Sequence, residues 1–337
     1  MSKVTTVGID LAKSVFQFHG IDASGEVMLR RQVRRAQMPQ MLSQLAPCVV
    51  VMEACGGAHY WARLSRELGH TVKLLAPRYV KAFVRGAKND RNDARAICEA
   101  GCQPGMPTVA VKSETQQGCL ALHRVRALAK KQRTMVANQV RGLLAEQGIV
   151  LAKRIGTIRR ELPGVLPRLE PHLRRALELQ WQQLQALDRQ IAVLDQELTE
   201  LASGSATCQR LMRERGVGPV IATAITAEVP EPRVFRNGRH FAAFLGLVPG
   251  QDSTGGRAKL LGVTKRGDAY LRTQLVHGAR SALRRAAHHD DELSRWAQAV
   301  AQRRGFNRAV VALANKLARR LWAILRYGEA FRATAAA

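Results

Sequence analysis

A short apolar run that ends in an acid constrains the fold of this chain more than any other feature. Residues 49–52 are wholly apolar and are followed directly by Glu53, which is typical of a strand buried on both faces of a sheet. A second strand-like segment, residues 4–9, is likewise followed directly by an acid, Asp10. Two such strands, separated by helical patterns, predict an α/β domain at the N-terminus.

The rest of the first hundred residues supports this interpretation. Phe16 and Phe18 alternate with Gln17 and His19, which is the period of two expected of a strand over residues 15–21. The connection between the first two strands, residues 10–14, suits a hairpin. Further strands are predicted at residues 26–33 and 72–75, and helices at residues 38–45, 59–68 and from 91 onward.

The middle of the chain is helical in pattern, over residues 116–147 and 171–201. The second stretch spaces its apolar residues by three, four and seven positions, which predicts either a coiled-coil arm or a core helix of a bundle. These residues are Leu173, Leu177, Leu184, Leu187, Ile191, Leu194 and Leu198. The segment between the two stretches is rich in arginine around Pro163 and Pro167, and we interpret it as a basic linker.

The last section, from about residue 206, is predicted to be mostly α-helical. Helical patterns flank Gly216-Val217-Gly218-Pro219, as in a helix-hairpin-helix, and two more helices begin near Asp268 and Asn307. A polar, glycine-rich stretch occupies residues 249–257. The expected domains are therefore 1–115 with a helical extension to about 150, a basic linker and helical arm over 151–205, and a C-terminal domain over 206–337.

The charge of the chain predicts a polyanionic partner. Its 337 residues include 53 Lys and Arg against 26 Asp and Glu, a formal net charge of +27. Each cation that meets a phosphate releases condensed counterions, so nucleic acid is the natural partner. A ribosomal protein would also be basic, so charge alone does not separate an enzyme from a scaffold.

Cysteine usage and hydropathy point to a cytosolic protein. The six cysteines form no CxxC pair and no zinc-like spacing with histidine, so we expect reduced thiols. The N-terminus lacks the long apolar region of a signal peptide. No window approaches eighteen uninterrupted apolar residues, so we expect no membrane partner.

Four acids form the candidate catalytic and metal site: Asp10, Glu53, Asp90 and Asp93. If the two apolar strands are neighbours, Asp10 and Glu53 emerge side by side. Asp90 and Asp93 share one face at the start of a helix and can complete a ring of carboxylates. Such a ring suits Mg²⁺, which prefers oxygen ligands and assists phosphoryl displacement. Each acid taken alone also has an ordinary structural explanation, as a cap or turn residue.

Three nearby acids compete for the same role. Asp22 follows the second strand, Glu26 begins the third, and Glu99 lies further along the helix of the Asp pair. Of these, Glu99 is the best substitute ligand by position.

The C-terminal section offers candidate nucleic-acid contacts. Gly216 and Gly218 would let backbone N–H groups approach a phosphate, although a plain turn between helices would need the same glycines. Arg257, Lys265 and Arg266 can hold a phosphodiester and stabilise its transition-state charge. Ser253 lies in the same glycine-rich loop, where a serine is ordinarily only a loop residue.

The motifs around the acids resemble those of a known family. They are Val7-Gly8-Ile9-Asp10, Met52-Glu53-Ala54-Cys55-Gly56 and Lys88-Asn89-Asp90-Arg91-Asn92-Asp93-Ala94. Together they are similar to the DEDD motif of insertion-sequence transposases of the "one-ten" and "eleven-eleven" type. The C-terminal motifs resemble the second domain of that family and follow in the expected order: Gly216-Val217-Gly218-Pro219, Phe244-Leu245-Gly246-Leu247-Val248-Pro249, Ser253-Thr254-Gly255-Gly256 and Thr264-Lys265-Arg266-Gly267-Asp268.

The resemblance implies a fold and a mechanism. The N-terminal domain would have a RuvC-like, RNase H-type fold, and the four acids would hold Mg²⁺. Ser253 would be the catalytic serine that forms a transient covalent link to a DNA phosphate. The resemblance also implies a structured guide noncoding RNA, donor and target DNA as substrates, and a homo-oligomer, either a dimer or a tetramer.

Three alternatives stay open at this stage. A related site-specific DNA invertase would share the motifs. A Holliday-junction-type nuclease would use metal-activated water and would not depend on Ser253. A non-enzymatic scaffold should bind nucleic acid better, not worse, when acids are removed.

Overall fold

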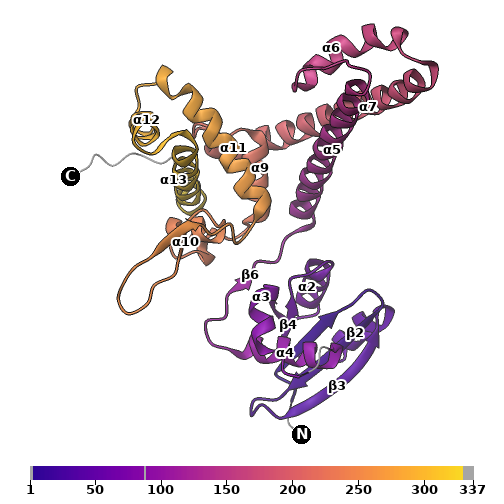
Figure 1. Ribbon diagram of the computed structural model, residues 1–337. Helices are drawn as coiled ribbons and strands as arrows, with labels where there is room; N and C mark the ends of the chain where they lie inside the picture. The colour runs from indigo at the N-terminus through magenta and orange to yellow at the C-terminus, as the bar shows by residue number, and fades with distance from the viewer. Residues whose placement is uncertain (1–2, 87–88, 329–337) are drawn as a thin grey trace. The chain divides into compact units, whose positions relative to one another are not determined.

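The protein folds into two compact units, residues 1–114 and 115–337. The computed structural model describes residues 3–86 and 89–328 (Figure 1). Within these residues, no helix is both long enough and apolar enough to span a bilayer.

Unit 1 is built on a mixed six-stranded sheet with the order β3-β2-β1-β4-β5-β6. Its strands are β1 Thr6–Leu11, β2 Val15–Ile21, β3 Val27–Arg34, β4 Val49–Glu53, β5 Thr71–Leu75 and β6 Thr108–Val109. Strands β1, β4 and β5 run parallel, whereas β2, β3 and β6 pair antiparallel. The parallel strands are central, which agrees with their nearly continuous apolar character.

Helices cover both faces of this sheet. Helices α1 (Met38–Ser43) and α2 (Ala58–Glu67) pack on one face, where Trp61 meets Phe16 edge to face. Helix α4 (Asp90–Cys102) packs on the other face, together with the short α3 (Pro77–Val80). A Cβ on Gly8 of β1 would lie 2.4 Å from the carbonyl oxygen of Ala94. The glycine therefore lets α4 lie directly on β1.

Most elements predicted for this unit are confirmed, within a residue or two at their ends. The prediction that the hairpin connection begins at Asp10 is wrong, because β1 continues to Leu11 and only residues 12–14 turn. Strand β6 and helix α3 have no pattern long enough to be predicted from sequence. Cys98 and Cys102 share α4, and the buried Cys98 packs under β1, where its Sγ donates to the Thr6 carbonyl.

The first part of unit 2 is a helical arm of three helices. They are α5 Glu114–Ala145, α6 Ile155–Val165 and α7 Pro171–Ser203. Apolar side chains of all three helices form one core, in which Ile158 and Leu162 of α6 are fully buried. The segment that was expected to be a basic linker thus contains a helix, which these two side chains anchor in the core. Helix α7 packs against helices of its own chain, as in a bundle.

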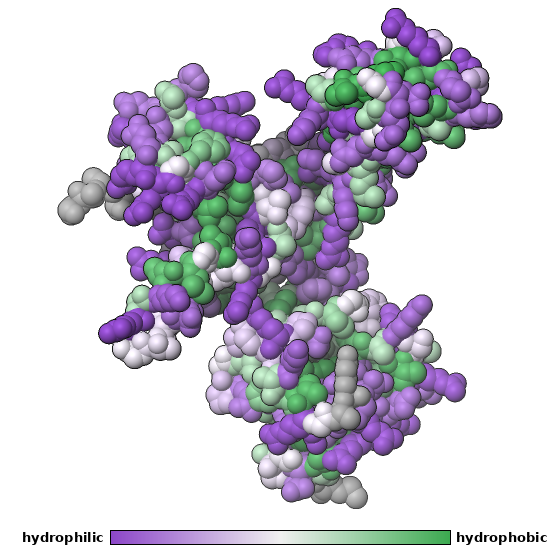
Figure 2. Space-filling model, viewed as in Figure 1, coloured by the Kyte–Doolittle hydropathy of each residue, from purple (hydrophilic) through white to green (hydrophobic). Residues whose placement is uncertain are grey.

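The remainder of unit 2 is a second helical core with one hairpin. The helices are α8 Ala206–Met212, α9 Pro219–Glu228, α10 Gly238–Phe244, α11 Ala269–Arg285, α12 Glu292–Arg304 and α13 Phe306–Tyr327. Strands β7 (Pro249–Gln251) and β8 (Leu260–Val263) form the hairpin. Helices α10 and α12 and the hairpin were not predicted from the sequence. Figure 2 shows hydrophilic side chains over much of the visible surface of this unit.

A buried polar network joins the arm to this second core. His123 of α5 is 1% exposed, and its ring nitrogens bond the Tyr270 hydroxyl at 2.9 Å and the Thr223 hydroxyl at 3.0 Å. Burial, followed by the charge of Arg126, lowers the pKa of His123 to about 4. The imidazole is therefore neutral at pH 7, and it links α5, α9 and α11 without carrying a charge.

Candidate active site

Asp10 and Glu53 lie on neighbouring parallel strands and face the same side of the sheet. Ile9 of β1 pairs with Met52 of β4, so the next residue on each strand is one of the two acids. Gly8 lies two positions before Asp10 and faces α4. Val51 lies two positions before Glu53 and also faces α4, because a Cβ on Gly101 of that helix would meet its side chain. Because side chains alternate along a strand, Asp10 and Glu53 also face α4.

The other two acids belong to the first turn of α4. The side chain of Asn89 caps the helix by accepting a hydrogen bond from the Asn92 amide at 2.9 Å. Asp90 is exposed and Asp93 is half-buried. Lys88, the first residue of the sequence motif, lies outside the described residues.

Electrostatics link the four carboxyl groups. Burial, followed by the charges of Asp93, Asp90 and Glu53, raises the pKa of Asp10 to about 6. A carboxyl group whose pKa is raised by three other carboxyl groups lies in a cluster that favours a cation. The structure thus places the sequence-predicted acids in one electrostatic neighbourhood.

The carboxyl groups of the cluster do not form a metal-binding arrangement in this structure. Over residues 3–86 and 89–328, no three acid, histidine or cysteine side chains are close enough together to hold one metal ion. The donor set nevertheless fits Mg²⁺, since it consists of hard carboxylate oxygens. To share one cation, the carboxyl groups would have to lie closer together than they do in this structure.

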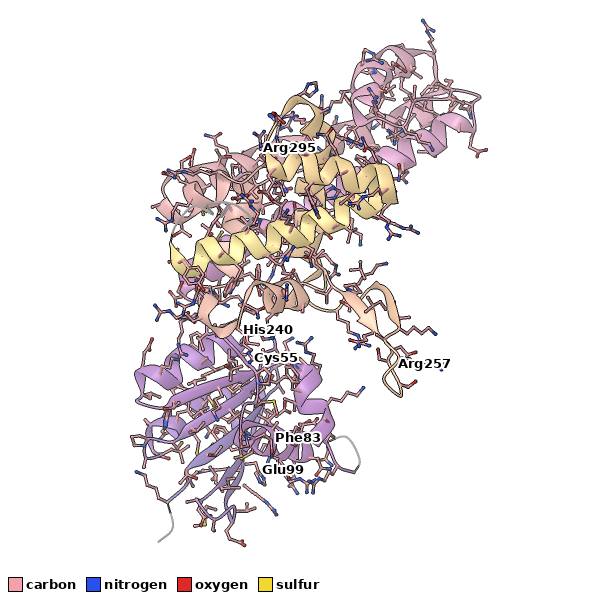
Figure 3. All side chains as sticks on the ribbon, turned by 90° about the vertical axis from the view of Figure 1, so that its left-hand side faces the viewer. Cys55, Phe83, Glu99, His240, Arg257 and Arg295 are labelled. Atoms are coloured by element: carbon pink, nitrogen blue, oxygen red, sulfur yellow. The ribbon has the colours of Figure 1, made fainter. Side chains whose placement is uncertain are left out.

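The competing acids have structural roles. Asp22 accepts hydrogen bonds from the Ser24 hydroxyl and from the Glu26 amide, which fixes the turn before β3. Glu99 (Figure 3) lies 3.5 Å from Arg95 and 3.7 Å from Arg85 in ion pairs. It does not contribute to the raised pKa of Asp10. Glu99 was the best substitute ligand by position, and in the structure it is paired with arginines.

Ser253 lies just beyond β7, on the hairpin whose outer end carries Arg257 (Figure 3). Its side chain is exposed. Its Oγ accepts hydrogen bonds from the Gln251 side-chain Nε2 at 2.8 Å and from the Lys259 backbone N–H at 3.2 Å. Gln251 was not predicted as a site residue, and its position two residues before Ser253 is the only sequence signal that links them.

Next to the hairpin, the segment around Gly246 passes very close to the segment around Gly267. A Cβ on Gly246 would lie 2.1 Å from the Arg266 carbonyl oxygen, and a Cβ on Gly267 would lie 1.8 Å from that of Phe244. Lys265 adopts a φ of 53°, in the left-handed region that non-glycine residues rarely occupy. This close approach fixes where Lys265 and Arg266 leave the helical core.

The two glycines of the helix-hairpin-helix candidate differ. A Cβ on Gly216 would lie 2.5 Å from the carbonyl oxygen of Gly278 on α11, so close packing explains this glycine. Gly218 has open space around it and is the N-cap of α9. Only Gly218 therefore presents a helix N-terminus with space for an anion beside it.

Comparison with known proteins decides the family. A model of the transposase IS116/IS110/IS902 family matches residues 208–295, and a transposase model of the DEDD type matches residues 7–148. The two matches cover the segments that carry the acids and Ser253. The chain belongs to the IS110 family of DEDD transposases.

Relatives of this transposase match it from end to end. A probable family 20 transposase of Pseudomonas aeruginosa is 48% identical, over 98% of this chain and 99% of the relative. The transposase for insertion sequence element IS1111A of Coxiella burnetii is 41% identical, over 98% and 92%. The transposase for element IS1328 of Yersinia enterocolitica is 39% identical, over 98% and 99%.

Proposed function

We propose that this transposase cleaves and rejoins DNA through a divalent-metal site at Asp10, Glu53, Asp90 and Asp93 and a nucleophile at Ser253. The observation that carries the metal site is the raised pKa of Asp10, which reports three further carboxyl groups around it. Three carboxyl groups that raise the pKa of a fourth form a cluster that favours a cation.

We assign the sheet of unit 1 to the RuvC-like, RNase H-type fold. Support comes from the strand order β3-β2-β1-β4-β5, with an antiparallel β1-β2-β3 meander followed by parallel β4 and β5. In this arrangement two acids end neighbouring central strands, and a helix brings the others over them.

Bound Mg²⁺ would supply Lewis-acid stabilisation of the phosphodiester and of the attacking and leaving oxygens. The chain's own contribution is to hold carboxylates where that charge is needed. Asp10 must lose its proton to serve as a ligand, and its pKa of about 6 allows this at neutral pH. Arg257, Lys265 and Arg266 are proposed to bind the DNA backbone, as is the open helix N-terminus at Gly218.

In the proposed step, the Ser253 hydroxyl gives up its proton and its oxygen bonds to phosphorus, while the bond from phosphorus to a deoxyribose oxygen breaks and that oxygen takes up a proton. Rejoining reverses this: a deoxyribose hydroxyl attacks the phosphoserine and the serine hydroxyl is restored. No external nucleotide is needed, because the phosphodiester energy is conserved. The two donors on the Ser253 oxygen support this role, since hydrogen bonds to an oxygen favour its anionic form.

We further propose that a structured noncoding RNA guides the reaction between donor and target DNA, and that the protein acts as a dimer or tetramer in the prokaryotic cytoplasm. These proposals rest on the resemblance described above. The net charge of +27 supports a second nucleic-acid partner besides DNA.

Strand cleavage by acid variants tests the proposal. Asp10→Ala and Asp90→Ala should abolish Mg²⁺-dependent cleavage of DNA spanning the element end, while binding of the same DNA persists in EDTA. Glu99→Ala is the matched control, because Glu99 is an acid on the same helix that is already ion-paired. Cleavage at the wild-type rate by either Asp variant would remove the metal site. Ser253→Ala separates recombination from a hydrolytic nuclease, which would still cut.

A further inference from the structure

Unit 1 contains a basic pocket that the proposed catalytic residues do not explain. It is a hollow of about 420 Å³ between strands β2 and β3 and the start of α4. Its lining consists of Gln17, Phe18, His19, Arg30, Arg31, Gln32, Arg91, Asn92 and Arg95. Its size falls within the roughly 300–1,000 Å³ range of small-ligand sites.

The pocket begins one strand away from Asp10. Asp10 pairs with Gln17 across β1 and β2, and Gln17 pairs with Gln32 across β2 and β3. All three residues share the face of the sheet that α4 covers. With about 4.8 Å between neighbouring strands, Gln17 lies about 5 Å from Asp10 and Gln32 about 10 Å from it.

The arginines that line the pocket differ in whether an acid pairs with them. Over the described part of the chain, neither Arg30 nor Arg91 has a carboxylate within ion-pairing distance, whereas Arg95 pairs with Glu99. Two guanidinium groups at the pocket are therefore available to an external anion.

His19 confirms how these charges converge. It is 6% exposed, and burial, followed by the charges of Arg30 and Arg95, lowers its pKa. The imidazole is thus neutral at pH 7 and adds a hydrogen-bonding group, as do the amides of Gln17, Gln32 and Asn92. Guanidinium and amide donors around one hollow suit phosphate oxygens.

The lining favours a phosphate over a base. Its aromatic side chain, Phe18, is fully buried and packs in the core on the opposite face of the sheet. The described walls therefore offer no exposed aromatic ring on which a base can stack. Charge and hydrogen-bond donors remain as the basis of recognition.

We propose that this basic pocket binds a backbone phosphate of the DNA strand that Asp10 and its partner acids cleave. Because Gln17 and Gln32 lie only about 5 and 10 Å from Asp10, that phosphate lies within about three nucleotides of the scissile one, at about 3.4 Å per nucleotide. The inference rests on the proposed function, because it takes the acids as the place of cleavage. The pocket positions the DNA strand, because its arginines attract the phosphate backbone whereas the acids, without a bound cation, repel it.

Binding measurements on the full-length protein in EDTA test the pocket without requiring cleavage. The probes are a labelled 20-nucleotide single-stranded DNA and an RNA of the same sequence. Arg30→Gln combined with Arg91→Gln should weaken DNA binding about fivefold at low salt. The plot of log K against log salt should flatten by about 0.7 for each phosphate that the variant no longer neutralises. Arg66→Gln, an exposed arginine on α2 on the other face of the sheet, should leave both values unchanged.

Cross-linking supplies the location. The photoactivatable amino acid benzoylphenylalanine in place of Gln32 should cross-link the DNA, and the same amino acid in place of Arg66 should not. Equal binding by the double variant and the Arg66→Gln control, or equal cross-linking at both positions, would overturn the proposal. Loss of RNA binding with unchanged DNA binding would also overturn it and assign the pocket to RNA. Cleavage of DNA by Asp10→Ala would contradict the proposed metal site, but it would leave the binding test of the pocket unaffected.

Discussion

Asp10 on strand β1 and Asp93 on helix α4 belong to one electrostatic cluster: burial of Asp10, then the charge of Asp93, are the two largest causes of its raised pKa. Gly8 makes this possible, because it lets α4 lie directly on β1. The carboxyl groups repel one another in the free protein. A bound cation would convert that repulsion into binding energy.

The raised pKa predicts that Asp10 costs stability at neutral pH. The pKa of Asp10 is about 6 in the folded protein, against an ordinary value of 3.8. Between these pH values the folded protein holds a proton that the unfolded chain has lost. Stability should therefore fall as pH rises from about 4 to 6. Asp10→Asn should remove this component and raise the free energy of unfolding at pH 7, in EDTA, by about 1 to 2 kcal/mol after allowance for solvent screening. Urea unfolding of both proteins at pH 4 and pH 7 measures it; a larger gain at pH 4 than at pH 7 would contradict the assignment.

Cation binding should show the opposite dependence on pH. Because the ligand must be ionised, Mn²⁺ affinity measured by electron paramagnetic resonance should rise from pH 5 to pH 7, with the steepest change near pH 6. Asp93→Asn should weaken Mn²⁺ at pH 7 by about tenfold or more. Glu99→Gln should bind Mn²⁺ like the wild type, since Glu99 is ion-paired with arginine. If Asp93→Asn and Glu99→Gln lost equal Mn²⁺ affinity, the ion would bind elsewhere.

Gly8 should be intolerant of a side chain. Its added Cβ would lie 2.4 Å from the Ala94 carbonyl oxygen and 2.5 Å from the Cys98 amide nitrogen, so α4 must move. We expect Gly8→Ala to destabilise the protein by about 1 to 3 kcal/mol and to reduce cleavage further by displacing Asp93. Gly56→Ala is the control, because a Cβ there meets no atom within 4 Å. Thermal unfolding and cleavage rates that match between the two variants would show that α4 does not rest on β1.

Gln251 should assist the serine without contacting DNA. Gln251→Met removes the side-chain donor on the Ser253 oxygen and leaves the Lys259 backbone donor in place. A hydrogen bond to a developing anion contributes about 1.5 to 3 kcal/mol, so the recombination rate at saturating DNA should fall about ten- to a hundredfold. Lys259→Gln, which keeps its backbone N–H, should change DNA affinity but not this saturated rate. A wild-type rate in Gln251→Met would make that hydrogen bond incidental.

The sequence predicts the sheet of unit 1 well, because its strands carry clear apolar runs with Asp10 and Glu53 near their ends. The hairpin around Ser253 could not be predicted. Its strands have three and four residues, and its exposed Leu260 and Leu261 give no alternating pattern. Helix α6 was hidden by its arginines, although Ile158 and Leu162 carry the spacing of four that buries one face.

The sequence predicts which residues form the candidate site but not how they are arranged. Spacing indicates that Asp90 and Asp93 share a helix face, yet only the packing of α4 on β1 shows which acids surround Asp10. The basic pocket had no sequence signal either. Arg30 and Arg91 are far apart in the sequence and meet only because α4 crosses the antiparallel side of the sheet.

Isolation of the DNA-linked peptide tests the central claim most directly. The full-length protein is incubated with Mg²⁺, its guide RNA and a nicked suicide DNA substrate that carries the element end, then digested with protease and nuclease and analysed by mass spectrometry. The account predicts a nucleotide attached to Ser253, present in the wild type and absent from Ser253→Ala and from Asp10→Ala. Efficient joining of donor to target by Ser253→Ala, or a nucleotide attached to a different residue, would contradict it.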